Sequence, residues 1–474
     1  MSLVAGYSSE SDSDSAGNLN GSTVENYKLT SSSSDARGRG HSANELNTDA
    51  ENVKVKRGHN GHEELIHVDK RRKRKGKGPW ASWSSSEEDE EDASADQASL
   101  ERKASTTDTI YREQDIEIQE PDDDSSTILE KSSFYGTSVV DYQGRGFLHP
   151  PMDVNVDFTK DQLSSRNYLP KRLIHTYQGH QNGTNVVQTL PRTGHLFLSG
   201  GNDNKIKIWD MYHDRQLLRD YSGHTKAVRD VNFNKDGSEF VSVSFDQQMK
   251  IWDTETGKVK HRYKFASTPN CAEFRPSDSS ELIVGLSNNE IRHYDLRIPH
   301  KQGLVQIYDH HLSAIIALKY FPDGSKLISS SEDKTMRIWE NQVNIPIKQI
   351  SDTAQYSMPY IDIHPEHNYF ASQSMDNAIY VFSMKPKYKR HPKKRFEGHK
   401  CAGFGIGFGF SPDGQFISSG DTQGRVFIWD WKTTRLLKQL EVPDKKAIVT
   451  VAWAPQETSK MLCAGNGEKI YLYD

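Results

Sequence analysis

Apolar and polar positions alternate in short stretches throughout residues 170–474. A period of two, as in Ile206-Lys-Ile208 and Met336-Arg-Ile338, predicts strands with two distinct faces. Seven such stretches end in an aromatic residue, usually followed by an acidic one: Trp209-Asp210, Trp252-Asp253, Tyr294-Asp295, Trp339-Glu340, Phe382-Ser383, Trp429-Asp430 and Tyr473-Asp474. The aromatic positions lie 43, 42, 45, 43, 47 and 44 residues apart. This period is typical of one four-stranded propeller blade per repeat, so we predict an all-β, seven-bladed propeller.

Several repeats carry the same polar residues at fixed distances from the tryptophan. A histidine lies 28 to 30 residues before it, a serine ten before and an aspartate six before. These residues resemble the WD-repeat family, which implies a buried hydrogen-bonded chain that locks each blade. The set comprises His180, Ser199, Asp203, Trp209, His224, Ser242, Asp246, Trp252, His311, Ser329, Asp333, Trp339, His399 and Trp429. A catalytic or metal-binding constellation is the alternative, but recurrence once per blade favours a structural role, because buried polar groups need partners.

The repeats ending at Tyr294, Phe382 and Tyr473 lack the Gly-His pair, which the repeat ending at Trp339 replaces by His310-His311. We expect these blades to depend more on apolar packing. The segment 172–177 lies where the outermost strand of a blade is expected, before the first Gly-His pair. We predict that it joins the last repeat, because closing the ring removes exposed strand edges.

Turns between strands are predicted from three tripeptides. Pro322-Asp-Gly, Pro412-Asp-Gly and Lys235-Asp-Gly each separate two apolar runs, and glycine supplies the backbone freedom that such turns require.

Residues 1–133 have a different composition. They are rich in Ser, Asp, Glu, Gly and Asn and lack an apolar period, so we predict a disordered N-terminal region. Residues 1–150 contain 18 Lys and Arg against 29 Asp and Glu, a net charge of −11, and the remainder contains 42 against 36, a net charge of +6. The formal charge of −5 therefore combines an acidic arm with a mildly basic propeller.

Charges within this N-terminal region are sorted into runs. Two basic clusters resemble a bipartite nuclear-import signal, with a solvated charge run or a loose nucleic-acid contact as the alternative. They consist of Lys56, Arg57, Lys70, Arg71, Arg72, Lys73, Arg74 and Lys75. Three serines at 84–86 precede an acidic run at 87–92, a pattern that suits an acidophilic kinase as well as a plain solubilising tract. We expect a nuclear protein.

Aromatic residues stand isolated in the polar N-terminal third. Such residues are natural anchors for pockets on a partner, so we predict a partner-binding arm over residues 134–169. The alternative is that residues 134–158 pack against the propeller itself. The candidate anchors, including two tryptophans before the arm, are Trp80, Trp83, Phe134, Tyr135, Tyr142, Arg145 and Phe147.

A strongly basic segment lies between the fifth and sixth aromatic endings. We expect residues 385–396 to form mostly a loop that contacts a phosphate backbone or an acidic protein surface, with Tyr388 available for stacking. A solvated insertion is the alternative. The candidate contacts are Lys385, Lys387, Tyr388, Lys389, Arg390, Lys393, Lys394 and Arg395.

A more specific resemblance covers nearly the whole chain from about residue 70. Gly78-Pro-Trp80, Asp141-Tyr-Gln-Gly-Arg145, Tyr168-Leu-Pro-Lys-Arg172 and Trp429-Asp-Trp-Lys-Thr-Thr434 look like the pre-mRNA-processing factor 17 family, its yeast members most of all. The resemblance implies a nuclear spliceosomal scaffold without catalytic activity, needed around exon ligation. It implies contacts with spliceosomal proteins and with the small nuclear RNA and pre-mRNA core, as a monomer within a large ribonucleoprotein assembly.

Sequence features of an enzyme are weak. The chain has no Gly-x-x-x-x-Gly-Lys-Ser/Thr phosphate loop, and Cys271, Cys401 and Cys463 form no Cys-x-x-Cys pair. We therefore expect no catalytic residues, no metal site, no cofactor and no small-molecule substrate. The polar N-terminus and the lack of a long apolar run argue against a membrane partner. Another nuclear propeller adaptor, such as a ubiquitin-ligase substrate receptor or a chromatin reader, is the alternative to the scaffold.

Overall fold

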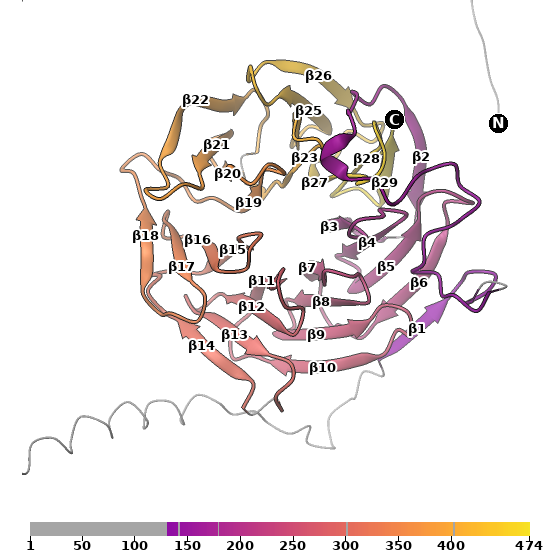
Figure 1. Cartoon of the computed structure of the whole chain (residues 1–474), viewed down its shortest axis with the longest axis horizontal. Helices are drawn as coiled ribbons and strands as arrows, with labels where there is room; N and C mark the ends of the chain where they lie inside the picture. Colours follow the sequence, from indigo (N-terminus) through magenta and orange to yellow (C-terminus); the bar gives the residue numbers. More distant parts are fainter. Residues whose placement is uncertain (1–129, 141–142, 179, 300–301, 402) are drawn as a thin grey trace, which may run out of the picture. The chain divides into compact units, whose positions relative to one another are not determined.

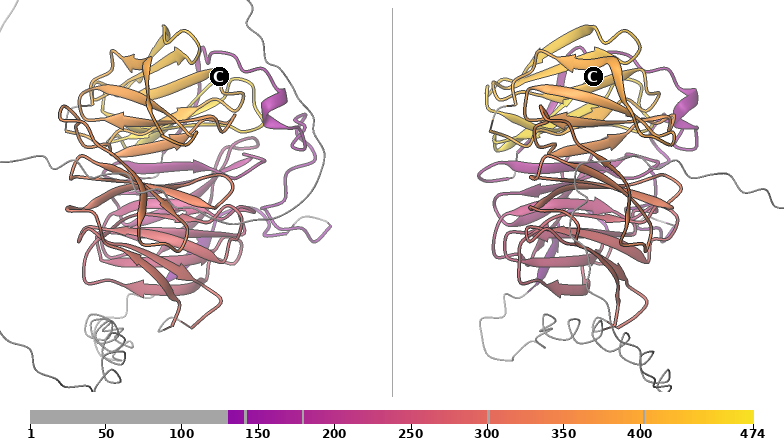
Figure 2. Two further views of the ribbon diagram at one scale, coloured as in Figure 1. Left: turned by 60° about the vertical axis from the view of Figure 1, so that its left-hand side comes forward. Right: turned by 90° about the vertical axis from the view of Figure 1, so that its left-hand side faces the viewer.

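The computed structural model describes residues 130–140, 143–178, 180–299, 302–401 and 403–474. Their strands form seven antiparallel sheets placed around a common centre, as Figure 1 shows. This arrangement confirms the predicted all-β, seven-bladed propeller. In the side views of Figure 2, the segment that precedes the first blade runs along one side of the ring.

Each blade runs from an inner strand to an outer strand. Blade 1 contains β3 (Thr184–Thr189), β4 (Leu196–Gly201), β5 (Lys205–Asp210), β6 (Leu217–Ser222) and, outside β6, β1 (Lys131–Phe134). Blade 2 contains β7 (Val228–Phe233), β8 (Glu239–Ser244), β9 (Gln248–Asp253) and β10 (Val259–Lys264). Blade 3 contains β11 (Pro269–Phe274), β12 (Glu281–Leu286), β13 (Ile291–Asp295) and β14 (Leu304–Tyr308).

The other four blades follow the same order. Blade 4 contains β15 (Ile315–Tyr320), β16 (Lys326–Ser331), β17 (Met336–Glu340) and β18 (Pro346–Ile350). Blade 5 contains β19 (Tyr360–Ile363), β20 (Tyr369–Ser374), β21 (Ala378–Ser383) and β22 (Arg390–Glu397). Blade 6 contains β23 (Phe408–Phe410), β24 (Phe416–Gly420), β25 (Arg425–Asp430) and β26 (Leu436–Glu441). Blade 7 contains β27 (Ile448–Trp453), β28 (Met461–Gly465), β29 (Lys469–Tyr473) and β2 (Leu173–Gln178).

The last blade is completed by a strand from the start of the ring. β2 pairs antiparallel with β29, and Leu173 lies opposite Tyr473. The backbone N–H groups of Lys171 and Arg172 also donate to the carbonyl of Asp474, at 2.6 and 2.8 Å. The predicted closure is therefore confirmed, and Figure 1 shows it where the purple β2 meets the yellow β29.

The three predicted turns are present. The N–H of Gly324 donates to the carbonyl of Phe321 at 2.8 Å, and Gly414 and Gly237 make the corresponding bonds. Gly324 has a φ of 68°, a left-handed conformation that glycine adopts without a steric penalty.

The core lies between neighbouring blades. Met249 of blade 2, for example, belongs to the same buried cluster as Ala272 and Leu282 of blade 3. The tryptophans at the ends of four repeats are at most 2% exposed. Truncating one such side chain to alanine costs about 3–5 kcal/mol of stability.

Polar side chains on the inner strands also bind one blade to the next. Gln188 Oε1 on β3 accepts from the N–H of Phe233 on β7 at 2.9 Å. Glu273 Oε2 on β11 accepts from the N–H of Tyr320 on β15 at 2.6 Å, and its Oε1 lies 3.0 Å from Lys319 Nζ. Neighbouring blades are thus held together by side-chain hydrogen bonds and an ion pair as well as by apolar packing.

The boundary predicted at residue 133 falls inside strand β1, which begins at Lys131. A 3-10 helix, η1 (Gln162–Ser164), follows in the segment that leads to β2. No helix among the described residues is long and apolar enough to cross a membrane.

Candidate interaction surfaces

The repeated polar residues of blades 1, 2 and 4 form buried hydrogen-bonded chains. In blade 4, His311 Nδ1 lies 2.9 Å from Asp333 Oδ2, and His311 Nε2 lies 2.7 Å from Ser329 Oγ. The indole N–H of Trp339 donates to the same Ser329 hydroxyl at 2.8 Å. The equivalent chains are His180, Ser199, Asp203 and Trp209 in blade 1, and His224, Ser242, Asp246 and Trp252 in blade 2.

The pKa shifts within the blade 4 chain fit a structural role. Burial lowers the pKa of His311, which favours the neutral ring. Burial acts to raise the pKa of Asp333, but hydrogen bonds from His311 and Thr335 outweigh it and hold that pKa well below its ordinary range. Both ring nitrogens of His311 are hydrogen-bonded inside the blade, so these residues have a structural role.

Blade 6 has the expected histidine and tryptophan but a different set of bonds. His399 Nε2 lies 3.0 Å from Gln373 Oε1 of blade 5, and the indole of Trp429 donates to the carbonyl of Glu397 at 3.1 Å. The serine ten residues before the tryptophan, Ser419, makes only a 3.4 Å contact with the carbonyl of Gly420. His399 and Trp429 therefore lie in the core without forming the predicted chain.

Blade 3 carries a polar pair that sequence reasoning missed. His293 Nε2 lies 3.1 Å from Glu281 Oε2, and Arg275 Nη1 donates to the same oxygen at 2.8 Å. Burial lowers the pKa of His293. The only signal in the sequence is a histidine immediately before the terminal aromatic, Tyr294, where the other repeats have isoleucine, valine or leucine.

The first part of the predicted arm packs on the propeller. The rings of Phe134 and Phe147 stack at a centroid distance of 5.6 Å, and the Arg219 guanidinium of β6 lies 5.2 Å from the Phe134 ring. Tyr135 is 55% exposed, although its hydroxyl donates to Asp220 at 3.3 Å. Phe134 and Phe147 therefore follow the packing alternative of the sequence analysis.

The rest of the arm makes contacts along blades 1, 6 and 7. The carbonyl of Phe147 lies 3.2 Å from His195 Nε2, and Phe158 packs edge-on against the same histidine. Further on, Asn167 N–H donates to Asp413 at 2.8 Å. Arg145 Nη1 donates to the sulfur of Met152 within the arm. Tyr142 lies outside the described residues.

The basic segment differs from its prediction in two respects. Residues 390–397 form the outer strand β22 of blade 5, so only the part before Arg390 is a loop. Tyr388 is 7% exposed and packs against Phe321, so its ring is not available for stacking on a base. Lys387 and Tyr388 have φ values of 96° and 45°, and this left-handed turn directs the ring inward.

Three cations of the same segment are engaged within the molecule. Lys394 Nζ lies 4.0 Å above the Trp431 ring, and the Arg390 guanidinium lies 3.7 Å from the Tyr380 ring centre. Arg395 pairs with Glu397 and Asp376. The exposed lysines of this segment that have no ion-pair partner among the described residues are Lys385, Lys387, Lys389 and Lys393.

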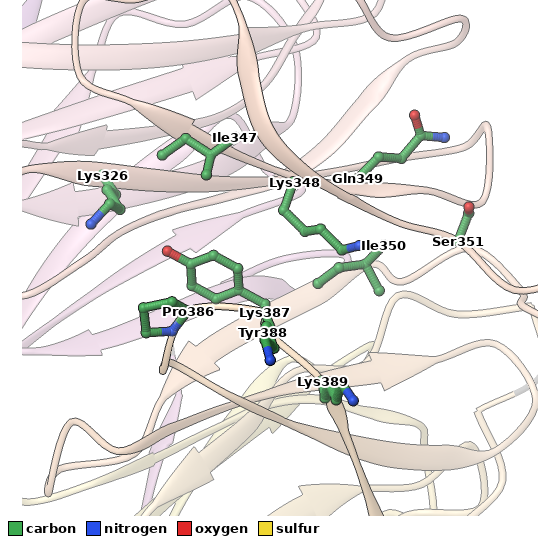
Figure 3. Close-up of a pocket in the computed structure, with 10 residues that line it drawn as sticks. All are labelled: Lys326, Ile347, Lys348, Gln349, Ile350, Ser351, Pro386, Lys387, Tyr388 and Lys389. Atoms are coloured by element: carbon green, nitrogen blue, oxygen red, sulfur yellow. The ribbon is translucent and has the colours of Figure 1, made fainter. Parts of the chain in front are cut away.

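A groove lies between blade 4 and this turn of blade 5. Its volume is about 690 Å³, and its walls are the stretch 347–351 along β18 and the turn 386–389, as Figure 3 shows. Lys326, Lys348, Lys387 and Lys389 line it together with Ile347 and Ile350. No carboxylate belongs to its lining, so the groove is positively charged.

The remaining candidates lie outside the described residues. They are the import-like residues Lys56, Arg57 and Lys70 to Lys75, and the tryptophans Trp80 and Trp83. Within the described part of the chain, no group of three or more His, Cys, Asp or Glu residues is placed to hold a metal ion. Cys271, Cys401 and Cys463 are buried free thiols.

Comparison with known sequence and structural families agrees with this architecture. Residues 171–210, 215–253, 302–340 and 390–430 match the model "WD domain, G-beta repeat". These four stretches hold the repeats with a Gly-His or His-His pair, and the three unmatched repeats lack it. The beta-propeller domain of Myceliophteria thermophila Cps50 (Swd1) superposes with a TM-score of 0.57 at 16% identity, covering 64% of this chain and 99% of that one, which shows the fold.

Curated relatives extend over more than the propeller. "Pre-mRNA-processing factor 17" of Saccharomyces cerevisiae is 52% identical over 477 residues and is covered, like this chain, to 100%. The proteins of the same name from Mus musculus and Homo sapiens are each 36% identical over 399 residues, which cover 84% of this chain and 67% of theirs. By full-length identity as well as by fold, the chain belongs to the pre-mRNA-processing factor 17 family.

Proposed function

We propose that this chain is a non-catalytic component of the spliceosome that supports the second transesterification step, exon ligation, as a scaffold for protein and RNA. The observation that carries the proposal is the 52% identity over the full length to a pre-mRNA-processing factor. The geometry supports a scaffold, because the recurrent His, Ser and Asp residues of blades 1, 2 and 4 are consumed by hydrogen bonds inside the blades.

A spliceosomal role implies a nuclear location for the chain. We propose that the two basic clusters at 56–57 and 70–75 act as its import signal. Replacing Lys70 to Lys75 by glutamine should move a fluorescent fusion of the full chain into the cytoplasm. Unchanged nuclear accumulation would assign import to another segment or to a partner.

The arm remains a proposed contact region for spliceosomal proteins, since Tyr135 and Tyr168 are 55% and 56% exposed while the segment around them is held on the propeller. Trp80 and Trp83 are proposed as further anchors. Deleting residues 134–158 while keeping the propeller tests this role, because retained association with the spliceosome would contradict it.

Depletion of the chain followed by RNA analysis tests the main proposal. We expect lariat-intron–exon intermediate and cleaved first exon to accumulate, because the first step proceeds and ligation fails. Adding back the intact chain should restore ligation. Normal ligation after depletion, with no small nuclear RNA recovered alongside the protein, would overturn the scaffold function.

A further inference from the structure

We propose that the outer edge of blade 4 is a docking site for an extended acidic peptide segment of a partner protein. The segment adds as a further strand to β18 and places carboxylates against the lysines of the neighbouring groove. Strand addition to an exposed sheet edge is a general mode of peptide recognition, in which backbone hydrogen bonds supply affinity and side-chain pockets supply specificity.

Blade 1 of the same molecule shows this arrangement. β1 adds to the outer strand β6 in antiparallel register, with Phe134 opposite Arg219 and Lys131 opposite Ser222. Immediately before β1, the Glu130 carboxylate lies 2.7 Å from Lys250 Nζ of blade 2. This propeller therefore already binds one extended segment at a blade edge, and an acidic residue of that segment pairs with the adjacent blade.

Positions on β18 match those that hold β1. In blade 1, Arg219 of β6 lies opposite Ile208 of β5, and in blade 4, Lys348 of β18 lies opposite Ile338 of β17. The stretch 348–351 thus corresponds to 219–222, the residues that pair with β1. These four positions of blade 4 all line the groove, and among the described residues β18 pairs with β17 alone.

Charge selects an acidic occupant. Lys326, Lys348, Lys387 and Lys389 converge on the groove from two blades, no carboxylate lines it, and none of the four forms an ion pair with another described residue. Lysines on an edge strand discourage pairing with neutral or basic strands. A strand that brings carboxylates removes this repulsion, so the same lysines both exclude wrong partners and attract the right one.

Apolar side chains at this edge favour a peptide over single-stranded RNA. Ile345 is 69% exposed and Ile347 is 45% exposed, and they flank Pro346, the first residue of β18. Proteins that bind single-stranded RNA commonly combine a basic groove with aromatic faces for base stacking, and the ring of Tyr388 is packed against Phe321. Alternating acidic and aliphatic side chains would use both the lysines and the isoleucines.

Binding of a labelled synthetic peptide to the full-length chain tests the site. The probe is a peptide of about ten residues that alternates glutamate and isoleucine, followed by fluorescence anisotropy. We expect a Kd below about 1 mM, and a loss of at least about tenfold when Lys348, Lys387 and Lys389 are all changed to glutamine. The matched control changes the exposed lysines Lys258, Lys264 and Lys432 to glutamine and should alter Kd by less than about twofold.

Two further probes separate strand addition from simple charge attraction. A peptide of the same sequence with N-methylated alternate amides keeps the charge but cannot pair along β18, so it should bind at least about tenfold more weakly. Equal binding of the methylated peptide, equal losses in the control variant, or a Kd above about 1 mM would each overturn the proposal. Tighter binding of an oligouridine of similar length, lost in the same triple variant, would identify an RNA site and overturn it as well.

The docking surface would serve the proposed scaffold, but the peptide assay is independent of splicing. If the peptide does not bind, the depletion experiment still tests the spliceosomal function. If depletion leaves splicing normal, the peptide can still bind, but the spliceosome is no longer the assembly in which it binds.

Discussion

Glu130 and Lys250 join the residue before β1 to the second blade, with the carboxylate Oε1 lying 2.7 Å from the lysine Nζ. The same carboxylate also pairs with Arg262 of β10. Because β1 belongs to the sheet of blade 1, this contact spans two blades. The side chain of Lys250 is 4% exposed, so its charge depends on Glu130 for compensation.

Glu130→Gln should destabilise the folded chain by about 1–3 kcal/mol at pH 7, because it leaves a buried lysine without a counter-charge. Burial acts to raise the pKa of Glu130, but the bonds from Arg262 and Lys250 outweigh it, so the folded pKa lies below the ordinary 4.5. Stability from this contact is therefore complete above pH 4.5 and is lost as the pH falls through the lower folded pKa.

Thermal unfolding at several pH values measures this effect. The difference between Glu130→Gln and the parent should be largest near neutral pH and should shrink under acidic conditions. The control Glu340→Gln changes an exposed carboxylate and should stay within about 0.5 kcal/mol of the parent. A pH-independent difference would show that the bridge contributes through packing and not through charge.

The blade 4 polar chain gives a second prediction. Ser329→Ala removes the hydroxyl shared by His311 and Trp339, and two buried nitrogen groups lose their partner. We expect a loss of about 2–4 kcal/mol in the free energy of unfolding. Ser419→Ala in blade 6 is the matched control, because Ser419 is equally buried but makes only one long contact, and it should cost less than about 1 kcal/mol. Equal losses in the two variants would contradict the role of the chain.

Repeat spacing predicted the blades because strand alternation and turn chemistry are local properties of the sequence. The closure by β2 could be predicted for the same reason. The last repeat lacks an outer strand of its own, and the strand that precedes the first repeat is the one left to fill that position. β1 was missed because Lys131–Phe134 is too short and polar to show a period, and its pairing depends on contacts distant in sequence.

The same reasoning could not predict the burial of Tyr388 or the altered hydrogen bonds of blade 6. Tyr388 is turned inward by two consecutive residues with positive φ, neither of them glycine. His399 lies at the expected distance from Trp429, but its partner Gln373 comes from the neighbouring blade. Partners that depend on how two blades meet have no signature in the spacing of one repeat.

Asp230 provides a prediction on pH. Burial raises its pKa to about 6, although the carboxylate accepts from the N–H of Ala272 at 3.3 Å. Because the unfolded carboxyl ionises near 3.8, the contribution of this group to stability is full below pH 3.8 and is lost as the pH rises through about 6. The stability of Asp230→Asn should therefore rise by about 2–3 kcal/mol relative to the parent between pH 4 and pH 8.

Denaturant unfolding of the two proteins at these pH values checks this expectation. The half-buried Asp230 also accepts from Asn232 at 3.2 Å, so the variant keeps an oxygen that can serve both donors. A constant difference across the pH range would contradict ionisation of Asp230 as the cause.

Release of the arm is predicted for Phe147→Ala. The substitution removes the ring that stacks on Phe134 and lies 5.9 Å from the Arg219 guanidinium. We expect about 1–2 kcal/mol of stabilisation of the arm to be lost, which increases its open population about five- to thirtyfold. Limited trypsin digestion should then cleave after Lys131 and Arg145 faster by a similar factor, while strands β2 to β29 stay intact, because none of them includes Phe147. The control Tyr168→Ala removes a ring that is 56% exposed and should leave the cleavage rate unchanged. Parental cleavage rates in Phe147→Ala would show that the contacts of β1 and Glu130 hold the arm without the aromatic stack.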